Sequence, residues 1–454
     1  MIALVVRQRH QIAELTAAVE TLRGEVERLT RDGKRQAAPF SKGARVAHPK
    51  RPGRKPGQGT FRYRTPPGAE AITEPVVVVP VTAPACPACG GALAAERVDA
   101  AYRTELPAVV RPRITAYRVA VCRCTACGRR LRGEHPDLAP DQYGATAHRV
   151  GPRLMAAAHM LHYGLGVPAR KVPAVLRTLT GVALTQGALT QDALRRAAGA
   201  VGGAYQRLRA GIGGAGAVHT DDTGWRVGGV PAWLMAFETD TATVYQVRPR
   251  HRNEEVREVV PAGYAGVMVT DRGKSYDAAG LGAVKQQKCL AHVQRSVTAV
   301  VETKRGKARW FGTRLKGLLR EAVALWHDRR DGKARGFAAH AARLRSAITH
   351  HLRDRTLSDR DNQRLLNELG GHHDRGNLLR FLSDPAVEPT NNRAERALRP
   401  AVIGRKVSQC SKTWGGAEAF AAFTSVVRTL ARTQGDSIID ALTQVFRPPK
   451  PQTV

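Results

Sequence analysis

In the stretch GAVHTDDTGWRVGG, residues 216–229, an apolar run is followed by two adjacent carboxylates. Ala217 and Val218 open what reads as a short buried strand, and Asp221 and Asp222 end it before a glycine turn. Aspartate is common where strands give way to turns, so a purely structural interpretation is available. The alternative is that the strand carries a metal ligand to the edge of a site that handles an anion. Other carboxylates alongside would favour the second interpretation.

The residues around and after this stretch follow a strand pattern. We predict strands over AVHTD (217–221), AWLMAF (232–237), ATVYQV (242–247), AGVMVTD (265–271) and AVKQQKCL (283–290), a charged helix over RNEEVREVV (252–260), and a helix from Ala291. The fourth strand ends on an acid, Asp271, as the first strand does. This order of elements resembles the ribonuclease H-like fold, in which the ends of the first and fourth strands are neighbours.

A third acid is expected on a late helix, within the stretch EPTNNRAERALRP. Thr390 or Asn391 would cap this helix, Glu395 would lie in it, and Pro400 would help to end it. Asn392 precedes Glu395 by three residues, which predicts that both side chains share one helix face and that Asn392 supports the site.

Three carboxylates that converge need a cation between them. Asp221, Asp271 and Glu395 should be ionised at neutral pH, since their ordinary pKa values are near 4. Two unit charges 4 Å apart repel by roughly 4 kcal/mol at an effective dielectric of about 20. Hard carboxylate oxygens select Mg²⁺ or Mn²⁺. Two such ions about 3.5–4 Å apart would suit an in-line phosphodiester displacement.

The charge balance points to a polyanionic partner. The 454 residues include 72 Lys and Arg against 38 Asp and Glu, a formal net charge of +34. Such an excess favours nucleic acid, and less often an anionic membrane. No apolar run approaches the roughly 18 residues that a spanning helix needs, and the opening MIALVV does not read as a signal peptide. We therefore expect no membrane partner.

Four cysteines predict one structural zinc site within residues 82–135. The strings CPACG and CTACG form two CxxC pairs with 34 residues between them and supply Cys86, Cys89, Cys124 and Cys127. Four thiolates complete a tetrahedral Zn²⁺ site and leave no open position for chemistry. The intervening ITAYRVAVCRC has strand character, as expected for a zinc ribbon. Cys122 offers an alternative register, two residues before a ligand.

Residues 1–30 carry a heptad pattern, with β-branched residues at a and leucine at d: Ile12, Leu15, Val19, Leu22, Val26 and Leu29. This pattern favours a parallel two-stranded coiled coil, and an amphipathic helix packed on its own domain is the alternative. Residues 31–81 predict a basic Pro/Gly-rich linker that cannot fold alone. Within it, KRPGRKPG has the character of an arm along DNA, or of a plain solvated tether, and supplies Lys50, Arg51, Arg54 and Lys55.

The fold class expected from these patterns is multidomain α+β or α/β. Residues 146–205 look helical, with Thr185 as an N-cap, and suit a helix-turn-helix that binds DNA or simple packing helices equally well. The helical stretch 300–385 would be an all-helical insertion. It would divide a ribonuclease H-like domain into 214–299 and 386–440, followed by a tail, 441–454.

Four strings carry a family resemblance: HTDDTGWRVGG, VMVTDRGKSYDA, QQKCLAHVQR and NNRAERALRPAVIGRKVS. Together they resemble transposases of the IS66 family. The CxxC pairs, the heptad helix and the basic linker resemble that family's amino-terminal half, in the same order. The resemblance covers nearly the whole chain and implies a DDE transposase of an insertion sequence. It also implies a bacterial cytoplasmic protein associated with the nucleoid.

The resemblance assigns roles to individual residues. It implies that Asp221, Asp271 and Glu395 are the catalytic triad and the Mg²⁺ ligands, with spacings of 50 and 124 residues. The family more often has glutamate where this chain has Asp222, which we expect to play a supporting part. Asp221 is favoured over Asp222 by the motif alignment.

Cys289 and His292 resemble a C-x-x-H signature shared by DDE enzymes with a helical insertion. We expect them to pack beside the active-site strands with a hydrogen bond, in preference to binding a metal. Trp310 or Trp326 in the insertion could stack on a flipped base, and a helix-core role is favoured for both. Basic residues beside the motifs are expected to contact DNA: Arg399, Arg405 and Lys406. Next to the first acids, Trp225 is expected to pack and Arg226 to contact the DNA backbone.

The function implied is cleavage at terminal inverted repeats, followed by strand transfer by the freed 3′-OH, with two Mg²⁺ or Mn²⁺ ions. A homodimer or higher multimer is expected because two ends must be synapsed, and accessory proteins of the same element are possible partners. Two rivals stay open. One is an inactive zinc-containing DNA-binding regulator, and the other is a ribonuclease H-like nuclease specific for branched DNA.

Overall fold

The protein is described from a computed structural model. The described residues are 11, 12, 14–16, 18, 19, 22 and 65–446, apart from 108, 109, 140, 279 and 354. The chain divides into two compact units, Met1–Val110 and Arg111–Val454. The boundary between the units falls within the stretch 82–135, which the sequence predicts to be one zinc ribbon.

In the first unit, the described residues between 11 and 22 are helical, and a short 3-10 helix covers Ala69–Ala71. Four of the predicted heptad positions fall on this helical stretch and are at least half exposed: Ile12, Leu15, Val19 and Leu22. Val26 and Leu29 lie outside the described residues. An apolar helix face turned to solvent is what a coiled coil needs, and its pairing stays a prediction.

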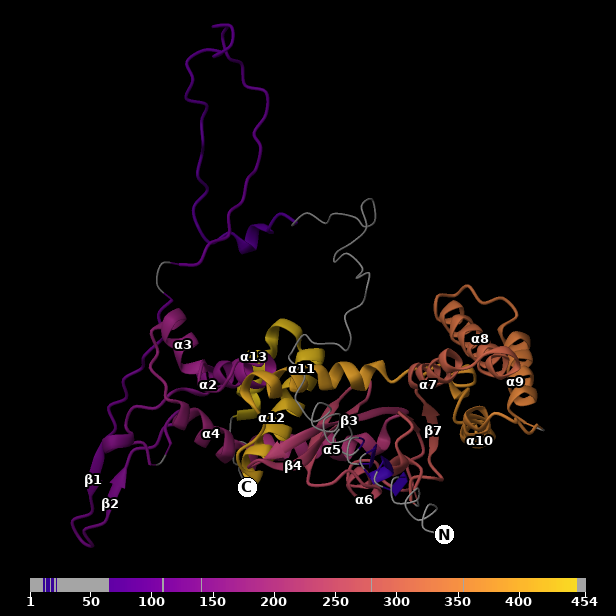
Figure 1. The fold of residues 1–454 in the computed structure, drawn as a ribbon. Helices are drawn as coiled ribbons and strands as arrows, with labels where there is room; N and C mark the ends of the chain where they lie inside the picture. The colour runs from indigo at the N-terminus through magenta and orange to yellow at the C-terminus, as the bar shows by residue number, and fades with distance from the viewer. Residues whose placement is uncertain are drawn as a thin grey trace. The chain divides into compact units, whose positions relative to one another are not determined.

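The second unit is built around a mixed sheet with the strand order β5–β4–β3–β6–β7 (Figure 1). Its strands are β3 (Ala217–Val227), β4 (Val230–Glu238), β5 (Thr243–Arg248), β6 (Val267–Thr270) and β7 (Lys285–Lys288). β3 is antiparallel to β4 and parallel to β6, β4 is antiparallel to β5, and β6 is parallel to β7. Helix α6 (Asn253–Arg257) follows β5, and α7 (Leu290–Thr303) follows β7. The predicted order of elements is confirmed, as is the adjacency of the first and fourth strands.

The first strand corrects the sequence interpretation. The acids at 221 and 222 do not end it, because β3 continues to Val227 and turns at Gly228 and Gly229, whose φ values are +58° and +85°. The segment after the acids stays paired with β4 throughout. The parallel pairing of β3 with β6, however, reaches only His219. The acids are therefore in mid-strand, yet they lie just beyond the carboxyl end of the parallel part of the sheet.

Alternation along β3 gives the sheet two different cores. On one face Val218 packs with Met235 and Phe237. On the other face Trp225 packs with side chains of β4, of α11 (Asn392–Ser408) and of α12 (Trp414–Thr433). Helices α11 and α12 therefore cover the face to which the odd-numbered residues of β3 point.

Helix α11 contradicts the prediction that Pro400 helps to end it. Pro400 lies inside the helix, which continues to Ser408. A proline removes the hydrogen bond to the carbonyl four residues earlier, here that of Arg396. Arg396 is exposed, so water can satisfy this carbonyl. The residue after the helix is Gln409, whose φ of +65° puts it in the left-handed region.

The predicted helical region contains α2 (Pro152–His159), a π-helical turn (Met160–Gly164), α3 (Val172–Thr180), α4 (Gln186–Ala198) and α5 (Ala200–Gly211). Thr185 caps α4 as predicted, because its hydroxyl accepts the N–H of Ala188 at 3.1 Å. Helices α2–α5 share a core with α12 and α13 (Ile438–Phe446). Leu442 and Phe446 are buried there, so the predicted tail 441–454 begins with helix.

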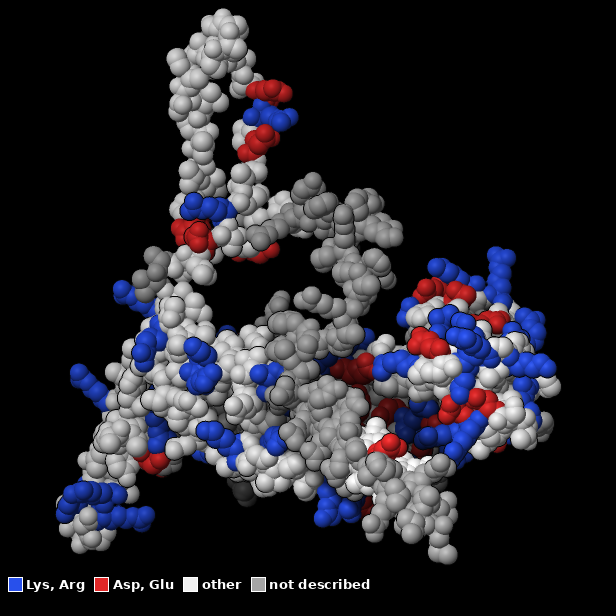
Figure 2. Space-filling model, in the orientation of Figure 1, with Lys and Arg blue, Asp and Glu red and all other residues white. Residues whose placement is uncertain are grey.

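The predicted insertion is helical and consists of α8 (Gly306–Arg330), α9 (Phe337–Leu352), α10 (Arg360–Asp374) and a 3-10 turn (Arg380–Leu382). Figure 1 shows these helices grouped beside α7 and β7, and their core continues into both α7 and β6. Trp326 packs against this core as predicted. Trp310 does not, since it is 58% exposed. Lys and Arg side chains cover much of the visible face of this helical group (Figure 2).

A small hairpin, β1 (Val121–Arg123) with β2 (Arg130–Arg132), precedes the helical region. Within the described stretch 114–124, strand structure is confined to the three residues of β1. No helix of the described residues is both long enough and apolar enough to cross a membrane.

Candidate nucleic-acid-processing site

The pleat of β3 sends Asp221 and Asp222 to opposite faces of the sheet. Asp221 is on the face of Trp225, which α11 and α12 cover. Asp222 is on the other face, where its Oδ1 lies 3.2 Å from Nδ1 of His251. Burial raises the pKa of Asp222 to about 7, and the charge of Asp271 acts in the same direction. Of the two acids, Asp221 is therefore the one directed toward α11.

Asp221 lies where its negative charge is disfavoured. The pKa of its carboxyl is raised to about 7, chiefly by burial, and the charges of Asp222, Asp271 and Glu395 act in the same direction. The backbone N–H of Asp222 opposes this shift, because it donates to Oδ1 of Asp221 at 2.9 Å. Residues far apart in the sequence thus share one electrostatic environment, and a cation there would favour the ionised form of Asp221.

Asp271 directly follows β6 and is fixed by the turn that it begins. Its Oδ1 accepts the N–H of Gly273 at 2.7 Å. On β7 next to it, Lys288 is fully buried, with Nζ 3.0 Å from Oδ1 of Asp277 and donating to Oγ1 of Thr270 at 3.2 Å. Burial lowers the pKa of Lys288, and the charge of Asp277 opposes that shift. Sequence reasoning missed Lys288, because polar residues in KQQK give no sign of burial.

Helix α11 is attached to the sheet by Asn391, which the sequence indicated only as a possible cap. Asn391 is fully buried, and its Nδ2 donates to the carbonyl oxygen of Thr220 at 2.7 Å. Its backbone N–H donates to Sγ of Cys289 at 3.2 Å. Asn391 occupies the N-cap position, but its side chain makes no capping hydrogen bond. Asn392, the predicted supporting residue, is exposed. The residue that supports the site is therefore Asn391.

Glu395 lies in the first turn of α11, beside Cys289 and His292. One candidate ligand atom from each of these three side chains lies within 4.8 Å of the other two. Within the described part of the chain, Glu395 Oε1 and His292 Nδ1 are buried without a hydrogen-bond partner. Cys289 is buried and accepts the N–H of Asn391, which agrees with the predicted packing role. A guanidinium nitrogen of Arg295 lies 3.9 Å from Glu395 Oε1.

The three predicted acids come into electrostatic contact without forming one ligand shell. Among the described residues, the group of three potential ligands within 4.8 Å of one another is that of Cys289, His292 and Glu395. Ligand oxygens about 2.1 Å from a single Mg²⁺ are at most roughly 4.2 Å apart. Asp221, Asp271 and Glu395 are therefore too widely spaced, as they stand, to surround one ion.

The basic residues predicted to contact DNA differ in their surroundings. Arg405 donates to Oγ1 of Thr223 at 3.2 Å and to the carbonyl oxygen of Gly224, so it ties α11 to β3. Arg399 and Arg226 are exposed, and Lys406 is partly so. The four predicted linker contacts lie outside the described residues: Lys50, Arg51, Arg54 and Lys55.

The two CxxC segments are turns of the same construction, one in each unit. In the first, the N–H of Cys86 donates to the oxygen of Gly91 at 2.9 Å, and that of Gly90 donates to Cys86 at 2.8 Å. The second repeats this pattern around Cys124 at 2.8 and 2.9 Å. Backbone N–H groups within each turn lower the pKa of the first thiol, Cys86 or Cys124. Each turn thus favours the thiolate form that binds metal.

An acidic site at the edge of a mixed sheet, in a chain of net charge +34, favours a protein that acts on a polyanion such as nucleic acid. The comparison with protein families is specific. Residues 147–419, more than half of the chain, match the model of the Transposase IS66 family. The chain belongs to this family. The match begins just before α2 and includes the whole sheet, the helical insertion and α11. No curated protein matches the chain.

Proposed function

We propose that this transposase is a DDE enzyme with a ribonuclease H-like catalytic domain, in which Asp221, Asp271 and Glu395 carry Mg²⁺-dependent cleavage and strand transfer of DNA. The observation that carries the proposal is the register of β3. The parallel pairing with β6 ends at His219, two residues before Asp221, while Asp271 directly follows β6. Asn391 fastens the start of α11 to Thr220, so Glu395 reaches the same edge.

The donor set fits two divalent ions. The charges of Asp271 and Glu395 help to raise the pKa of Asp221, and Glu395 has a buried oxygen without a hydrogen-bond partner, so this set of carboxylates suits hard cations. Asp221, Asp271 and Glu395 would hold the ions. When bound, two Mg²⁺ ions would activate the attacking oxygen and stabilise the leaving one in an in-line displacement.

The chain's own residues would organise the substrate around this site. Asn391 and the Cys289 thiol hold the first turn of α11 against β3, which fixes the direction of Glu395. Lys288 and the turn at Gly273 hold the segment around Asp271. Exposed basic side chains such as Arg399 would attract the phosphodiester backbone, in a salt-dependent way that does not depend on sequence.

Zinc is proposed for the four cysteines at 86, 89, 124 and 127, as one structural ion per chain. The support is the thiolate-favouring construction of the two CxxC turns. Four sulfur ligands would give the ion no part in the chemistry. Dimerisation is proposed through the exposed apolar face of the helical stretch between 11 and 22.

The deciding experiment incubates the full-length chain with duplex DNA that carries the inverted repeats flanking its gene, with and without Mg²⁺. We expect cleavage at the repeat ends and joining of the freed 3′-OH to a target duplex, only with Mg²⁺. Cleavage of branched DNA without joining would identify the structure-specific nuclease instead. Binding of the repeats with no Mg²⁺-dependent change in the DNA would identify the inactive regulator.

A further inference from the structure

The cluster of Cys289, His292 and Glu395 contains two kinds of ligand that the proposed Mg²⁺ chemistry does not use. One candidate ligand atom from each side chain lies within 4.8 Å of the other two. Among the described residues, no other three cysteine, histidine or acidic side chains come so close together. Sulfur and imidazole nitrogen suit a borderline transition metal such as Zn²⁺, whereas Mg²⁺ prefers oxygen ligands alone.

The three side chains come from the starts of two helices. Cys289 is the N-cap residue of α7, and His292 lies in the first turn of the same helix. The spacing of three residues puts both side chains on one side of α7. Glu395 comes from the first turn of α11. Helix starts that are about 100 residues apart in the sequence therefore bring three ligands to one place.

Cys289 is held firmly and keeps capacity for a metal. Its backbone N–H donates to the carbonyl oxygen of Thr270 at 2.7 Å, and its Sγ accepts the N–H of Asn391 at 3.2 Å. The contact with Asn391 engages only part of the sulfur's capacity. Burial raises the pKa of Cys289, and N–H groups at the start of α7 and on Asn391 oppose this rise. A bound cation would act in the same direction as these N–H groups.

The other two side chains each have an unsatisfied atom in the described structure. Oε1 of Glu395 and Nδ1 of His292 are buried without a hydrogen-bond partner. A guanidinium nitrogen of Arg295 lies 3.9 Å from Glu395 Oε1, which is too long for a hydrogen bond, and the Arg295 side chain is 65% exposed. Buried polar atoms without partners call for a bound group. Both a carboxylate oxygen and a ring nitrogen offer lone pairs to a cation.

The spacing of the cluster suits one tetrahedral ion after a small movement. With Zn–S bonds of about 2.3 Å and Zn–N or Zn–O bonds of about 2.1 Å, the ligand atoms lie about 3.3–3.6 Å apart. The separations in the cluster, at most 4.8 Å, exceed this by no more than about 1.5 Å. His292 and Glu395 are only partly buried, so side-chain rotation can close the gap. Their exposure also lets water occupy the fourth position.

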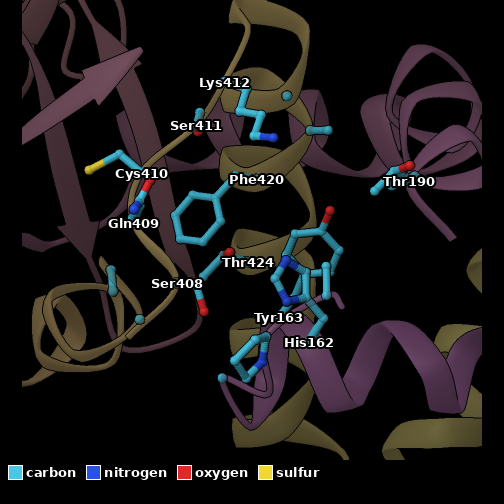
Figure 3. Close-up of a pocket in the computed structure, with 18 of the residues that line it drawn as sticks. His162, Tyr163, Thr190, Ser408, Gln409, Cys410, Ser411, Lys412, Phe420 and Thr424 are labelled. Atoms are coloured by element: carbon cyan, nitrogen blue, oxygen red, sulfur yellow. The ribbon is translucent and has the colours of Figure 1, made fainter. Parts of the chain in front are cut away.

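Cys410 provides a comparison within the same chain. It is partly buried and lines a cavity of about 660 Å³ between the helical region and the loop that joins α11 to α12. Figure 3 shows Cys410 and His162 on opposite sides of this cavity. None of the described lining residues is acidic, and Cys410 belongs to no described group of three potential metal ligands. A cysteine and a histidine in one cavity are therefore not enough, and the convergence at Cys289 is specific.

We propose that Cys289, His292 and Glu395 bind one borderline divalent ion such as Zn²⁺, which links the start of α7 to the start of α11. Three protein ligands hold the ion less tightly than four thiolates would, so the site fills when metal is added. A carboxylate bound to this ion loses its freedom to rotate, and the ion thereby fixes the direction of Glu395. The inference goes beyond the proposed function, because neither DNA nor Mg²⁺ takes part in it.

The test titrates the full-length chain with Co²⁺, without DNA or Mg²⁺, after loosely held metal has been removed. Co²⁺ can replace Zn²⁺, and a thiolate ligand gives it a charge-transfer band in the near ultraviolet. We expect about one Co²⁺ per chain to produce this band and added Zn²⁺ to abolish it. Cys289→Ser should remove the band, although the serine hydroxyl can still accept the N–H of Asn391. Cys410→Ser is the matched control and should keep the band.

A second variant separates a metal ligand from a structural residue. His292→Asn removes an Nδ1 that has no hydrogen-bond partner in the described structure, so the Tm of the metal-free chain should not fall. It should weaken Co²⁺ binding at least about a hundredfold, because even residues behind metal ligands can cost that much. Added Zn²⁺ should raise the Tm of the wild type more than that of His292→Asn.

Three results would each overturn the proposal. They are the absence of a thiolate band in the wild type, a band of equal size in Cys289→Ser, and an unchanged Co²⁺ affinity in His292→Asn. Failure of Mg²⁺-dependent DNA cleavage is a separate result, since the titration contains neither Mg²⁺ nor DNA.

Discussion

The acidic site and the CxxC turns are built in opposite ways. Each CxxC turn closes within six residues, through two backbone hydrogen bonds around its first cysteine. The acidic site draws on β3, on the end of β6 and on the first turn of α11, and it exists only when the sheet is formed. The chemistry of a CxxC turn depends on a few neighbouring residues, whereas that of the acidic site depends on the topology of the sheet.

The difference also appears in the electrostatics. In the turns, backbone N–H groups lower the pKa of Cys86 and Cys124, so the ligand form is favoured before any metal arrives. In the acidic site, burial and like charges raise the pKa of Asp221 to about 7, so the ligand form is disfavoured until a cation binds. The proposed zinc ion would therefore bind to turns that already favour thiolates, and the proposed Mg²⁺ ions would relieve repulsion between carboxylates in a folded site.

The largest effect expected is on catalysis, when the acids on the two faces of β3 are substituted one at a time. Asp221→Asn should lower Mg²⁺-dependent end cleavage about 10³-fold, since several kcal/mol of charge stabilisation would be lost. Asp222→Asn, on the opposite face beside His251, should cost less than about tenfold. Single-turnover cleavage measures both, with DNA binding as the control. An inactive Asp222 variant beside an active Asp221 variant would move the site to the other face of the sheet.

The next largest effect concerns zinc binding and tests the CxxC turns, which are built from local contacts. Cys124→Ser should reduce bound zinc from about one ion per chain to a small fraction, as measured by atomic emission. Cys122→Ser, two residues earlier on β1, is the matched control and should keep the ion. Because the turn is local, neither change should alter the rise in Tm on adding Mg²⁺. Zinc loss with Cys122→Ser alone would establish the alternative register.

A smaller catalytic effect is expected from the attachment of α11. Asn391→Ala removes the donor to the Thr220 carbonyl and should lower cleavage about ten- to a hundredfold, the usual cost of losing a residue that orients a ligand. Stability should fall by about 1–3 kcal/mol, because that buried carbonyl loses its partner. Asn392→Ala, on the exposed neighbour, should change neither. Measuring kcat together with urea unfolding for the pair would expose a purely structural role, in which stability falls and kcat does not.

The smallest effect is a pH dependence of stability in metal-free buffer. Asp221 and Asp222 have folded pKa values raised to about 7, above the unfolded value near 4. Between these values the unfolded chain releases protons that the folded chain keeps, so Tm should fall as pH rises from 5 to 8. Mg²⁺ at pH 8 should raise Tm by a few degrees, and Asp221→Asn should flatten the profile. A Tm that rises across this range would contradict the shared acidic environment.

The sequence predicted the parts of this molecule that have a period or a motif. The strands were recognisable from apolar runs, the cap at Thr185 from its hydroxyl, and the helical insertion from its composition. The length of β3 was not, because Thr223 and Gly224 look like the start of a turn, whereas pairing with β4 holds them in the sheet. Likewise Pro400 indicates a helix end, yet α11 continues past it. The carbonyl that loses its hydrogen bond is that of Arg396, an exposed residue.

The residues that support the site could not be predicted from the sequence, for a different reason. Asn391 and Asn392 are the same residue type at adjacent positions, and only the packing of α11 decides which is buried. Lys288 is charged and would be expected in solvent, yet Asp277 and Thr270 compensate its burial. Such roles depend on contacts between distant segments, which no local pattern contains.

The shared core of α2–α5 with α12 and α13 has a consequence for how the chain is made. The guanidinium of Arg196 on α4 donates to the carbonyl oxygen of Phe446, 250 residues later. At about 5–20 residues per second, a ribosome needs roughly 10–50 s to supply the second half of this core. The early helices must wait for it with apolar side chains uncovered. A chain truncated before α13 would leave these apolar side chains exposed and would be a substrate for chaperones and proteases. This core can therefore form only near the end of translation.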